Sequence, residues 1–202
     1  QGAFAQYMTI PKRCLIEAPK DMDPNHIALT EPAATVIHAV NIAVEESYLP
    51  IQECQVLIIG AGAIGLLTAL LLKSYGVKMQ VLETNLARHP CVKEHVGINP
   101  TNPLTESIRD NSFDVVIDCV GSEKTSSLSF DTVKTGGVIV NVGLQSWTSS
   151  INIRKLTLEE IKLIGCYTYS MEDFKSALKT IERGEFGNLS WIKELPLSDA
   201  NL

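Results

Sequence analysis

The sequence has no cluster of basic residues and no apolar run long enough to cross a bilayer. Its 202 residues carry a formal net charge of −6, and a membrane-spanning helix needs about 20 consecutive apolar residues. An acidic chain without a patch of lysines and arginines has little attraction for nucleic acids or anionic lipids. We therefore expect neither a nucleic acid nor a membrane among its partners.

Paired cysteines are absent as well. The five cysteines are widely scattered and no two form a C-x-x-C pair, which argues against a zinc ribbon and a redox dithiol. Residues 1–17 lack the basic head, apolar middle and small-residue cleavage site of a signal peptide. An odd number of thiols in such a chain is typical of a reducing compartment, so we predict a cytoplasmic protein.

Aromatic residues are few, at 6%, but 45% hydrophobic and 20% charged residues are ordinary values for a globular chain. The length suits one large domain, or one domain with a fragment of another. From about residue 55 to residue 168, continuous apolar runs alternate with helical patterns. Strands of this kind are buried on both faces of a parallel sheet. The expected fold is α/β, a doubly wound parallel sheet.

Turn and capping residues set the boundaries of the predicted elements. Ser170 and Asp173 form a capping box that begins a helix over residues 171–186. Pro32 should interrupt or restart a helix that begins at residue 23 or 25 and ends near residue 44. The other predicted helices cover residues 63–76, 86–97 and 126–134, and the predicted strands cover residues 2–11, 14–19, 55–60, 78–83, 113–121 and 136–144, with one more ending near residue 168.

An apolar run at residues 56–59 stops at the pattern G-x-G-x-x-G and restarts as a helical pattern. Gly60 permits the tight turn, Gly62 lets a pyrophosphate approach the backbone, and Gly65 lets the helix pack closely on the strand. The free N–H groups at the start of the helix would hold the phosphates. Such glycines alone also mark plain turns, but a strand before them and a helix after them indicate a dinucleotide-binding turn.

A single carboxylate, Glu83, ends the next apolar run, 18 residues after Gly65. A carboxylate at this place accepts hydrogen bonds from the adenosine ribose hydroxyls and repels a 2′-phosphate. The sequence therefore predicts NAD rather than NADP as the cofactor.

Together these motifs resemble the zinc-type medium-chain dehydrogenases, in the branch of the alcohol and sorbitol dehydrogenases. The resemblance runs along nearly the whole chain, through "ALTEPAATVIHAV", "VLIIGAGAIGLLTALLLKSYG", "FDVVIDCVG", "GGVIVNVGL" and "KLIGCYTYSMEDFKSAL". It implies a Rossmann domain over residues 32–168, the C-terminal part of a GroES-like catalytic domain over 1–31, and a truncated return segment over 169–202. It also implies that most of the catalytic domain lies outside this chain.

The resemblance assigns roles to further residues, none of them catalytic. Thr35 falls where the family touches the nicotinamide end, Ile64 where an aliphatic side chain backs the cofactor, and Arg88 beside the adenosine ribose. The backbone of residues 166–168 would help to bind the carboxamide. The ends of two strands would contact the nicotinamide ribose and the carboxamide through Val120, Gly121, Val142, Gly143 and Leu144.

Glu31, in "TEP", falls where the family places a zinc ligand or a Glu that holds the zinc-bound water. Zinc is thus implied for the intact parent, where it would polarise the oxygen of a primary or secondary alcohol or polyol before hydride transfer to NAD. A homodimer or homotetramer is implied as well. His38 lies among apolar helix residues and Cys119 inside a strand, so we interpret both as packed side chains.

Two other functions stay open. One is a stand-alone NAD-binding module with a regulatory role and no catalysis, and the other is a zinc-free quinone reductase of the same superfamily. The pair Glu31-Pro32 and the intact glycine pattern argue against the reductase. An upstream reading frame encoding the zinc-binding Cys and a His-Glu pair would separate the dehydrogenase from the regulatory module.

Overall fold

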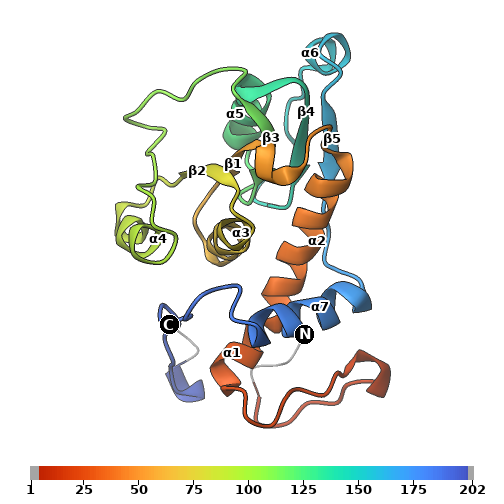
Figure 1. Ribbon diagram of the computed structural model, residues 1–202, viewed down its shortest axis with the longest axis vertical. Helices are drawn as coiled ribbons and strands as arrows, with labels where there is room; N and C mark the ends of the chain where they lie inside the picture. Colours follow the sequence, from red (N-terminus) through yellow and green to blue (C-terminus); the bar gives the residue numbers. More distant parts are fainter. Residues whose placement is uncertain (1–4, 200–202) are drawn as a thin grey trace.

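The computed structural model describes residues 5–199, which form a five-stranded sheet with helices on both faces (Figure 1). Every pair of neighbouring strands is parallel, in the order β2-β1-β3-β4-β5. The predicted α/β fold with a doubly wound parallel sheet is confirmed. The strands are β1 (Gln55–Ile59), β2 (Lys78–Leu82), β3 (Phe113–Asp118), β4 (Val133–Asn141) and β5 (Lys162–Gly165).

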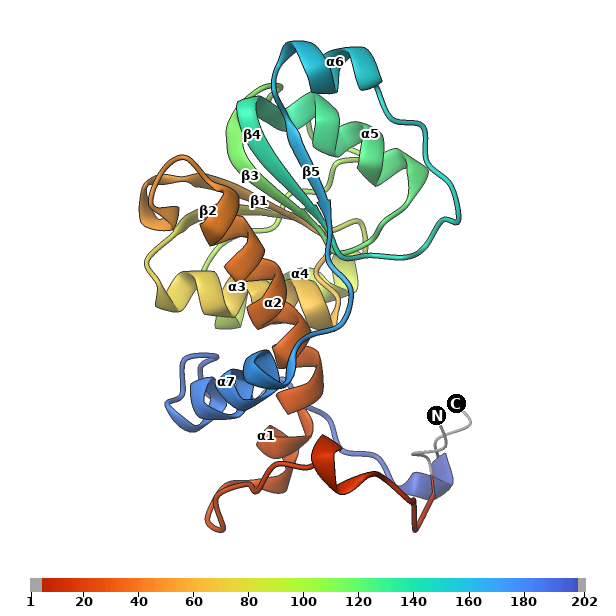
Figure 2. The same ribbon diagram turned by 90° about the vertical axis from the view of Figure 1, so that its right-hand side faces the viewer.

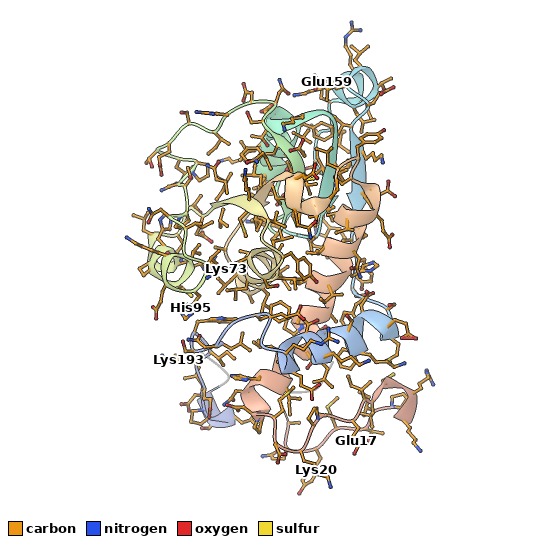
Figure 3. All side chains as sticks on the ribbon, viewed as in Figure 1. Glu17, Lys20, Lys73, His95, Glu159 and Lys193 are labelled. Atoms are coloured by element: carbon orange, nitrogen blue, oxygen red, sulfur yellow. The ribbon has the colours of Figure 1, made fainter. Side chains whose placement is uncertain are left out.

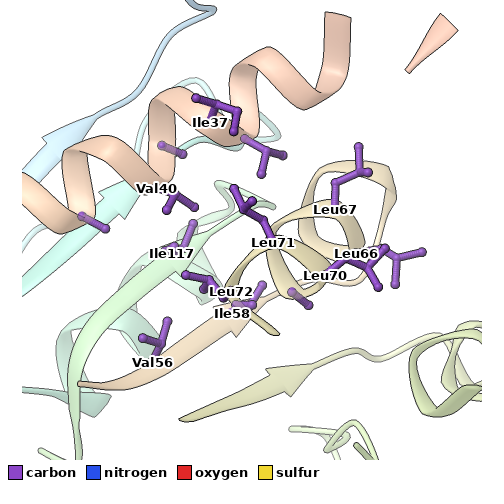
Figure 4. Close-up of a cluster of buried hydrophobic side chains, with 14 of the residues drawn as sticks. Ile37, Val40, Val56, Ile58, Leu66, Leu67, Leu70, Leu71, Leu72 and Ile117 are labelled. Atoms are coloured by element: carbon purple, nitrogen blue, oxygen red, sulfur yellow. The ribbon is translucent and has the colours of Figure 1, made fainter. Parts of the chain in front are cut away.

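Apolar side chains cover both faces of the sheet, which explains why the strand sequences do not alternate with polar residues. On β3, Val115 and Ile117 face the larger core cluster and Val116 faces the smaller one. In Figure 4 the larger cluster combines Ile117 with side chains of β1 and of two helices, α2 (Thr30–Glu46) and α3 (Ala63–Ser74). The smaller cluster lies under α5 (Glu123–Thr132), on the opposite side of the sheet (Figure 2).

The helix predicted from residue 23 or 25 is divided into α1 (Pro24–Ala28) and α2. The break lies at Leu29, before Pro32 rather than at it. Pro32 is the third residue of α2, where a helical N–H has no partner within the helix, so its missing N–H costs nothing. Asp23 caps α1 by accepting a hydrogen bond from the Asn25 N–H at 2.9 Å.

Helix α3 ends at Ser74, and Gly76, with a φ of +73°, closes it two residues later as predicted. It is tied to the next helix, α4 (His89–His95), where Lys73 Nζ donates a hydrogen bond to the carbonyl of His95 at 2.8 Å. The two side chains lie near each other in Figure 3. A short 3-10 helix, Leu86–Arg88, precedes α4, in agreement with the broken helix expected over residues 86–97.

The predicted capping box at Ser170 and Asp173 is confirmed at the start of α7 (Met171–Glu182). Asp173 also accepts a hydrogen bond from Asn41 at 3.2 Å, and its Oδ2 lies 3.1 Å from His38 Nδ1. His38 is therefore not only a packed helix residue: its side chain is one-third exposed and joins α2 to α7 through a carboxylate.

The strands predicted near the N-terminus are wrong wherever the structure describes them. Residues 5–19 form irregular chain with a 3-10 helix at Lys12–Cys14, and residues 2–4 lie outside the described part. A strand needs a neighbour to pair with, and residues 5–199 offer this segment none. A short helix, α6 (Ile153–Leu158), was not expected, and two more 3-10 helices cover Ile51–Glu53 and Leu197–Asp199. No helix of the described residues is both long and apolar enough for a membrane crossing.

Candidate functional site

The glycine turn lies where β1 ends and α3 begins, at the carboxyl edge of the sheet. Gly60 has a φ of +90°, and a Cβ on Gly65 would lie 1.8 Å from the carbonyl oxygen of Gly60. Only glycine allows this approach of helix to turn. A Cβ on Gly62 would meet no protein atom within 4 Å. The fold therefore does not itself require glycine at position 62, whereas a ligand at the helix N-terminus would.

Glu83 comes directly after β2 and points back to the glycine turn. Its side chain is only 5% exposed, and its carboxylate accepts three hydrogen bonds. Oε2 accepts from the Ala61 N–H at 2.8 Å and from Arg88 at 3.1 Å, while Oε1 accepts from the Asn85 N–H at 2.7 Å. Burial alone would raise the pKa of Glu83, but these hydrogen bonds and the Arg88 charge outweigh it and lower that pKa.

The hydrogen bonds leave Glu83 with little spare capacity. A carboxylate offers about four acceptor positions, and three are already filled by groups of the protein. One position on Oε1 stays available to a ribose hydroxyl. A second hydroxyl, as the sequence predicts, would have to replace Arg88 or share Oε2 with it.

The loop after β2 is fixed by two further contacts. Asn85 Oδ1 accepts a hydrogen bond from the Ala87 N–H at 3.0 Å, and His89 Nε2 lies 2.9 Å from the carbonyl oxygen of Glu83. Arg88 is thereby held beside Glu83, with about half of its side chain exposed. The structure brings together the two residues that the sequence assigned to the adenosine ribose.

The loops after β3 and β4 touch each other through two glycines. Gly121 has a φ of +68°, and a Cβ on it would lie 1.9 Å from the carbonyl oxygen of Gly143. The first loop also reaches the glycine turn, because a Cβ on Gly60 would lie 2.6 Å from Cγ2 of Val120. Val120, Gly121, Gly143 and the turn thus form one continuous edge, with Val142 and Leu144 flanking Gly143.

Asp118, the last residue of β3, joins these two loops. Its Oδ1 accepts hydrogen bonds from the N–H groups of Val120 and Gly121 at 2.9 and 3.0 Å. Its backbone carbonyl accepts from the N–H groups of Val142 and Gly143 at 2.9 and 3.0 Å. No role is predicted for Asp118 from the sequence, although its carboxylate ends a buried strand as that of Glu83 does.

The remaining predicted residues lie on helices. Ile64 is half-buried in the first turn of α3 and packs against the larger core cluster. Thr35 is half-buried on α2, and Glu31 is exposed in the first turn of that helix. Burial, and then the negative charge of Glu31 and a hydrogen bond to it, raise the pKa of Tyr169. Within residues 5–199, no three His, Cys, Asp or Glu side chains are grouped so that they could hold a metal ion.

All five cysteines are free. Cys119 and Cys166 border the carboxyl edge, and burial raises their pKa values to about 12 and about 11. Thiols of this kind are poor nucleophiles because so little thiolate forms at neutral pH. Cys119 is packed against the larger core cluster as predicted, but it directly follows β3 and does not lie within the strand.

Comparison with protein families identifies residues 63–183, which run from the start of α3 to the end of α7. This segment matches the family model described as zinc-binding dehydrogenase. The match covers more than half of the chain and includes most of the sheet.

Curated relatives are polyol and sugar-acid dehydrogenases. The chain is 25% identical over 199 residues to sorbitol dehydrogenase 1 of Saccharomyces cerevisiae, and 28% identical over 197 residues to L-galactonate-5-dehydrogenase of Escherichia coli. Each alignment covers 91% of this chain, but only 54% and 55% of the relatives. The chain thus spans about half the length of these relatives.

Solved structures of similar fold include nucleotide complexes. A putative zinc-binding dehydrogenase of Sinorhizobium meliloti bound to NADP superposes with a TM-score of 0.80 at 25% identity, covering 91% of this chain and 56% of the other. Acetophenone reductase of Geotrichum candidum in complex with NAD gives a TM-score of 0.82 at 21% identity, covering 92% and 53%. The second likeness shows the shared fold alone.

Proposed function

Because this chain belongs to the zinc-binding dehydrogenase family, we propose that it is the NAD-binding portion of an alcohol or polyol dehydrogenase. The single observation that carries the proposal is the hydrogen bond from the Ala61 N–H to Glu83 at 2.8 Å, which links the glycine turn to the ribose-binding carboxylate. We assign the cofactor domain to residues 32–168. Residues 1–31 and 169–202 are proposed as parts of the catalytic domain.

The residues at the carboxyl edge fit a dinucleotide. The N–H groups in the first turn of α3 point out of the helix end and would bind the pyrophosphate, and the open space at Gly62 gives it access. The free acceptor position on Glu83 suits a ribose hydroxyl. When bound, the nicotinamide would accept a hydride from the carbon that bears the alcohol; the residues of this chain bind and orient the ring. The proposed ring contacts come from Thr35, Val120, Gly121, Val142, Gly143 and Leu144.

We propose NAD rather than NADP because Glu83 is ionised and its negative charge would face a 2′-phosphate. Arg88 opposes this effect in part, since its guanidinium could turn toward a phosphate. In the structure, however, it is bound to Glu83 Oε2 at 3.1 Å. A phosphate would therefore have to break this ion pair and accept the repulsion of the carboxylate.

The described residues do not fit a catalytic zinc site. Such a site takes three protein ligands and one open position, and residues 5–199 hold no group of three candidate side chains. We therefore derive no step through zinc for this chain. Zinc is proposed only for the longer protein, in which Glu31 would be one ligand or would hold the zinc-bound water.

We also propose that two copies associate through β5. This strand ends the sheet, so one row of its N–H and C=O groups has no partner strand within residues 5–199. Apolar side chains are exposed beside it, among them Tyr167 at 76% and Leu158 at 67%. Pairing two such edges would bury both features about a two-fold axis. The cytoplasm remains the predicted compartment, which the five free thiols support.

Calorimetric titration with NAD and NADP tests the proposed cofactor site. We expect NAD to bind at least tenfold more tightly, because charged hydrogen bonds contribute about 1.5–3 kcal/mol each. In Glu83→Gln this preference should fall at least tenfold, because the repulsion is lost and Arg88 is released. Equal affinities of the unmodified chain for the two cofactors would contradict the proposal.

Gly62→Ala separates cofactor binding from folding. The added methyl group meets no protein atom, so the free energy of unfolding should stay within about 0.5 kcal/mol of the original value. It would nevertheless stand between the backbone and the pyrophosphate, and NAD affinity should fall at least tenfold. Unchanged NAD affinity in the folded variant would show that the pyrophosphate does not bind at this turn.

The 202-residue chain by itself should bind NAD without oxidising alcohols, whether or not zinc is added. An alcohol without a metal or a base keeps its proton, and hydride loss from the neutral alcohol is very slow. The measurement follows reduced cofactor by absorbance with sorbitol, ethanol, butanediol and threonine, on zinc-loaded and chelated protein. Zinc-dependent turnover at about 1 per second or faster would contradict this expectation.

A further inference from the structure

A cavity lies on the other side of the sheet from α3. Its volume is about 340 Å³, and it is enclosed by the ends of β3, β4 and β5, by α5, and by the loop that follows β4. Figure 2 shows that loop passing along α5 before it reaches α6. The volume falls within the range of about 300–1,000 Å³ that is usual for small-molecule sites.

The polar group at the base of this cavity is the carboxylate of Asp118. The residue is only 1% exposed, and its Oδ1 is occupied by the N–H groups of Val120 and Gly121. Oδ2 is buried and accepts no hydrogen bond. None of the ion pairs found in residues 5–199 involves this side chain.

A buried carboxylate oxygen without a donor is unfavourable by a few kcal/mol and needs an explanation. The rest of the protein supplies many donors at the same edge, yet none is directed to Oδ2. Two hydroxyl groups of α5 line the cavity without reaching Oδ2: the Ser129 hydroxyl donates to the Thr125 carbonyl, and the Ser126 hydroxyl is hydrogen-bonded to that of Ser149. Within residues 5–199, the buried Oδ2 of Asp118 is therefore an acceptor without a donor.

The walls around Asp118 are largely apolar. Phe130 and Ile139 are buried and Leu163 is half-buried, and Trp147, on the loop that lines the cavity, is fully exposed. A ligand in this cavity would meet a negative oxygen at one end and apolar side chains along its length.

We propose that this cavity binds a small organic amine, with its protonated nitrogen on Asp118 Oδ2 and its apolar body against Phe130, Ile139 and Leu163. An ammonium group has only donors and carries the charge opposite to that of the carboxylate. A neutral alcohol of the same shape would form a weaker bond. The cavity shares Gly121, Gly143 and Leu144 with the proposed ring contacts. The amine itself would be held by Asp118, Phe130, Ile139 and Leu163, none of which is assigned to the cofactor, so its binding does not require NAD.

Trp147 provides a direct reporter of binding. The chain has two tryptophans, so in a Trp191→Phe background the tryptophan fluorescence comes from Trp147 alone. Without NAD present, cyclohexylmethylamine should change this fluorescence saturably. Cyclohexylmethanol, its neutral counterpart, should bind at least tenfold more weakly.

Substitutions locate the ligand. Asp118→Asn keeps an oxygen for the Val120 and Gly121 N–H groups but removes the charge, and amine affinity should fall at least tenfold. Asp131→Asn, which removes an exposed carboxylate from the same helix that lines the cavity, is the matched control and should bind the amine normally. Ser126 lines the cavity and is half-exposed, so a phenylalanine at this position should fill the cavity and abolish amine binding. This variant tests the site even if Asp118→Asn does not fold.

Three results would overturn the proposal. The first is equal binding of the amine and the alcohol, and the second is unchanged amine binding in folded Asp118→Asn or in Ser126→Phe. The third is an equal loss in Asp131→Asn, which would mean that the amine is attracted only by the overall charge of −6. NAD titration of the same variants shows separately whether the cofactor site is intact.

Discussion

Glu83 and Asp118 both lie at the carboxyl edge of the sheet, where a parallel strand ends, and both are buried, at 5% and 1% exposure. Their oxygens differ in what surrounds them. Glu83 uses both oxygens and holds the glycine turn, the loop after β2 and Arg88 together. Asp118 uses one oxygen to shape the loops after β3 and β4, and leaves the other without a donor.

This difference divides the carboxyl edge of the sheet into two regions, called corners here. They differ in how far the protein itself satisfies the hydrogen-bonding capacity of the carboxylate. At the β1–β2 corner, the protein saturates the carboxylate almost fully, and the open space lies instead at Gly62. At the β3–β4–β5 corner, the backbones of Gly121 and Gly143 touch and hold the two loops together. The carboxylate there has one oxygen without a hydrogen-bond donor. The first corner thus offers N–H donors at a helix end, whereas the second offers a carboxylate acceptor.

The largest effect is expected where backbone atoms touch. Gly121→Ala forces a Cβ to 1.9 Å from the Gly143 oxygen at a φ of +68°, and should destabilise the chain by about 3 kcal/mol or more. Gly165→Ala is the matched control, because its Cβ would meet nothing within 4 Å. Urea unfolding measures both. A small effect of Gly121→Ala would show that the loops separate easily and that this corner is not closed by their contact.

Glu83→Gln should have the next largest effect, about 1–3 kcal/mol of destabilisation. A glutamine has one oxygen and one NH₂ group, and both carboxylate oxygens of Glu83 accept from backbone N–H groups. In either orientation the NH₂ group therefore faces a donor, and Arg88 loses its partner. Urea unfolding with an unchanged m-value provides the test. A neutral outcome would mean that Glu83 is not saturated in the way that distinguishes it from Asp118.

Much of this edge could be predicted from the sequence, because local patterns determine it. The apolar strands, the glycine turn, Glu83 and the capping box at Ser170 each depend on residues close together in the chain. Asp118 could be noticed as a strand-end carboxylate, but its unpaired oxygen depends on where α5 and the loop after β4 come to lie. Those are contacts between distant segments, and no local pattern encodes them.

The N-terminal strands were predicted wrongly for a related reason. Residues 5–19 contain a rough alternation of apolar and polar side chains, but a strand also requires a partner strand, and the alternation does not supply one. Helix α6 was missed because six residues are too few to establish a helical period. Its start is marked only by Asn152, which accepts a hydrogen bond from the Lys155 N–H at 2.9 Å.

Lowering the pH should remove the contribution of Glu83 to the stability of the fold over a predictable pH range. The pKa of Glu83 is lowered from its ordinary value of 4.5, because its hydrogen bonds and Arg88 outweigh burial. Its contribution to stability is therefore present above about pH 4.5 and is lost as the pH falls through the lower folded-state pKa. Urea unfolding at pH 6, 4.5 and 3.5 should show a smaller loss of stability in Glu83→Gln than in the unmodified chain.

Asp173 provides the comparison for this acid range. Burial raises its pKa, but hydrogen bonds from Ser170 and the charge of His38 outweigh it, so that the pKa lies below its ordinary value of 3.8. Its contribution to stability is therefore present above about pH 3.8 and is lost as the pH falls through its folded-state pKa, so Asp173→Asn should begin to reduce the loss only below about pH 3.8. Identical profiles for the two variants would mean that neither carboxylate determines the response to acid in this range.

Asp118→Asn should have the smallest effect on stability, within about 0.5 kcal/mol in the absence of an amine. Asparagine retains an oxygen for the N–H groups of Val120 and Gly121, and its NH₂ group takes the position of the oxygen that has no donor. A buried charge without a partner is replaced by a neutral amide, so little is lost. Urea unfolding of this variant beside Glu83→Gln measures the contrast between the two carboxylates directly. If Asp118→Asn destabilises the chain as much as Glu83→Gln does, then Oδ2 already has a donor in solution, and the two corners do not differ in the way described.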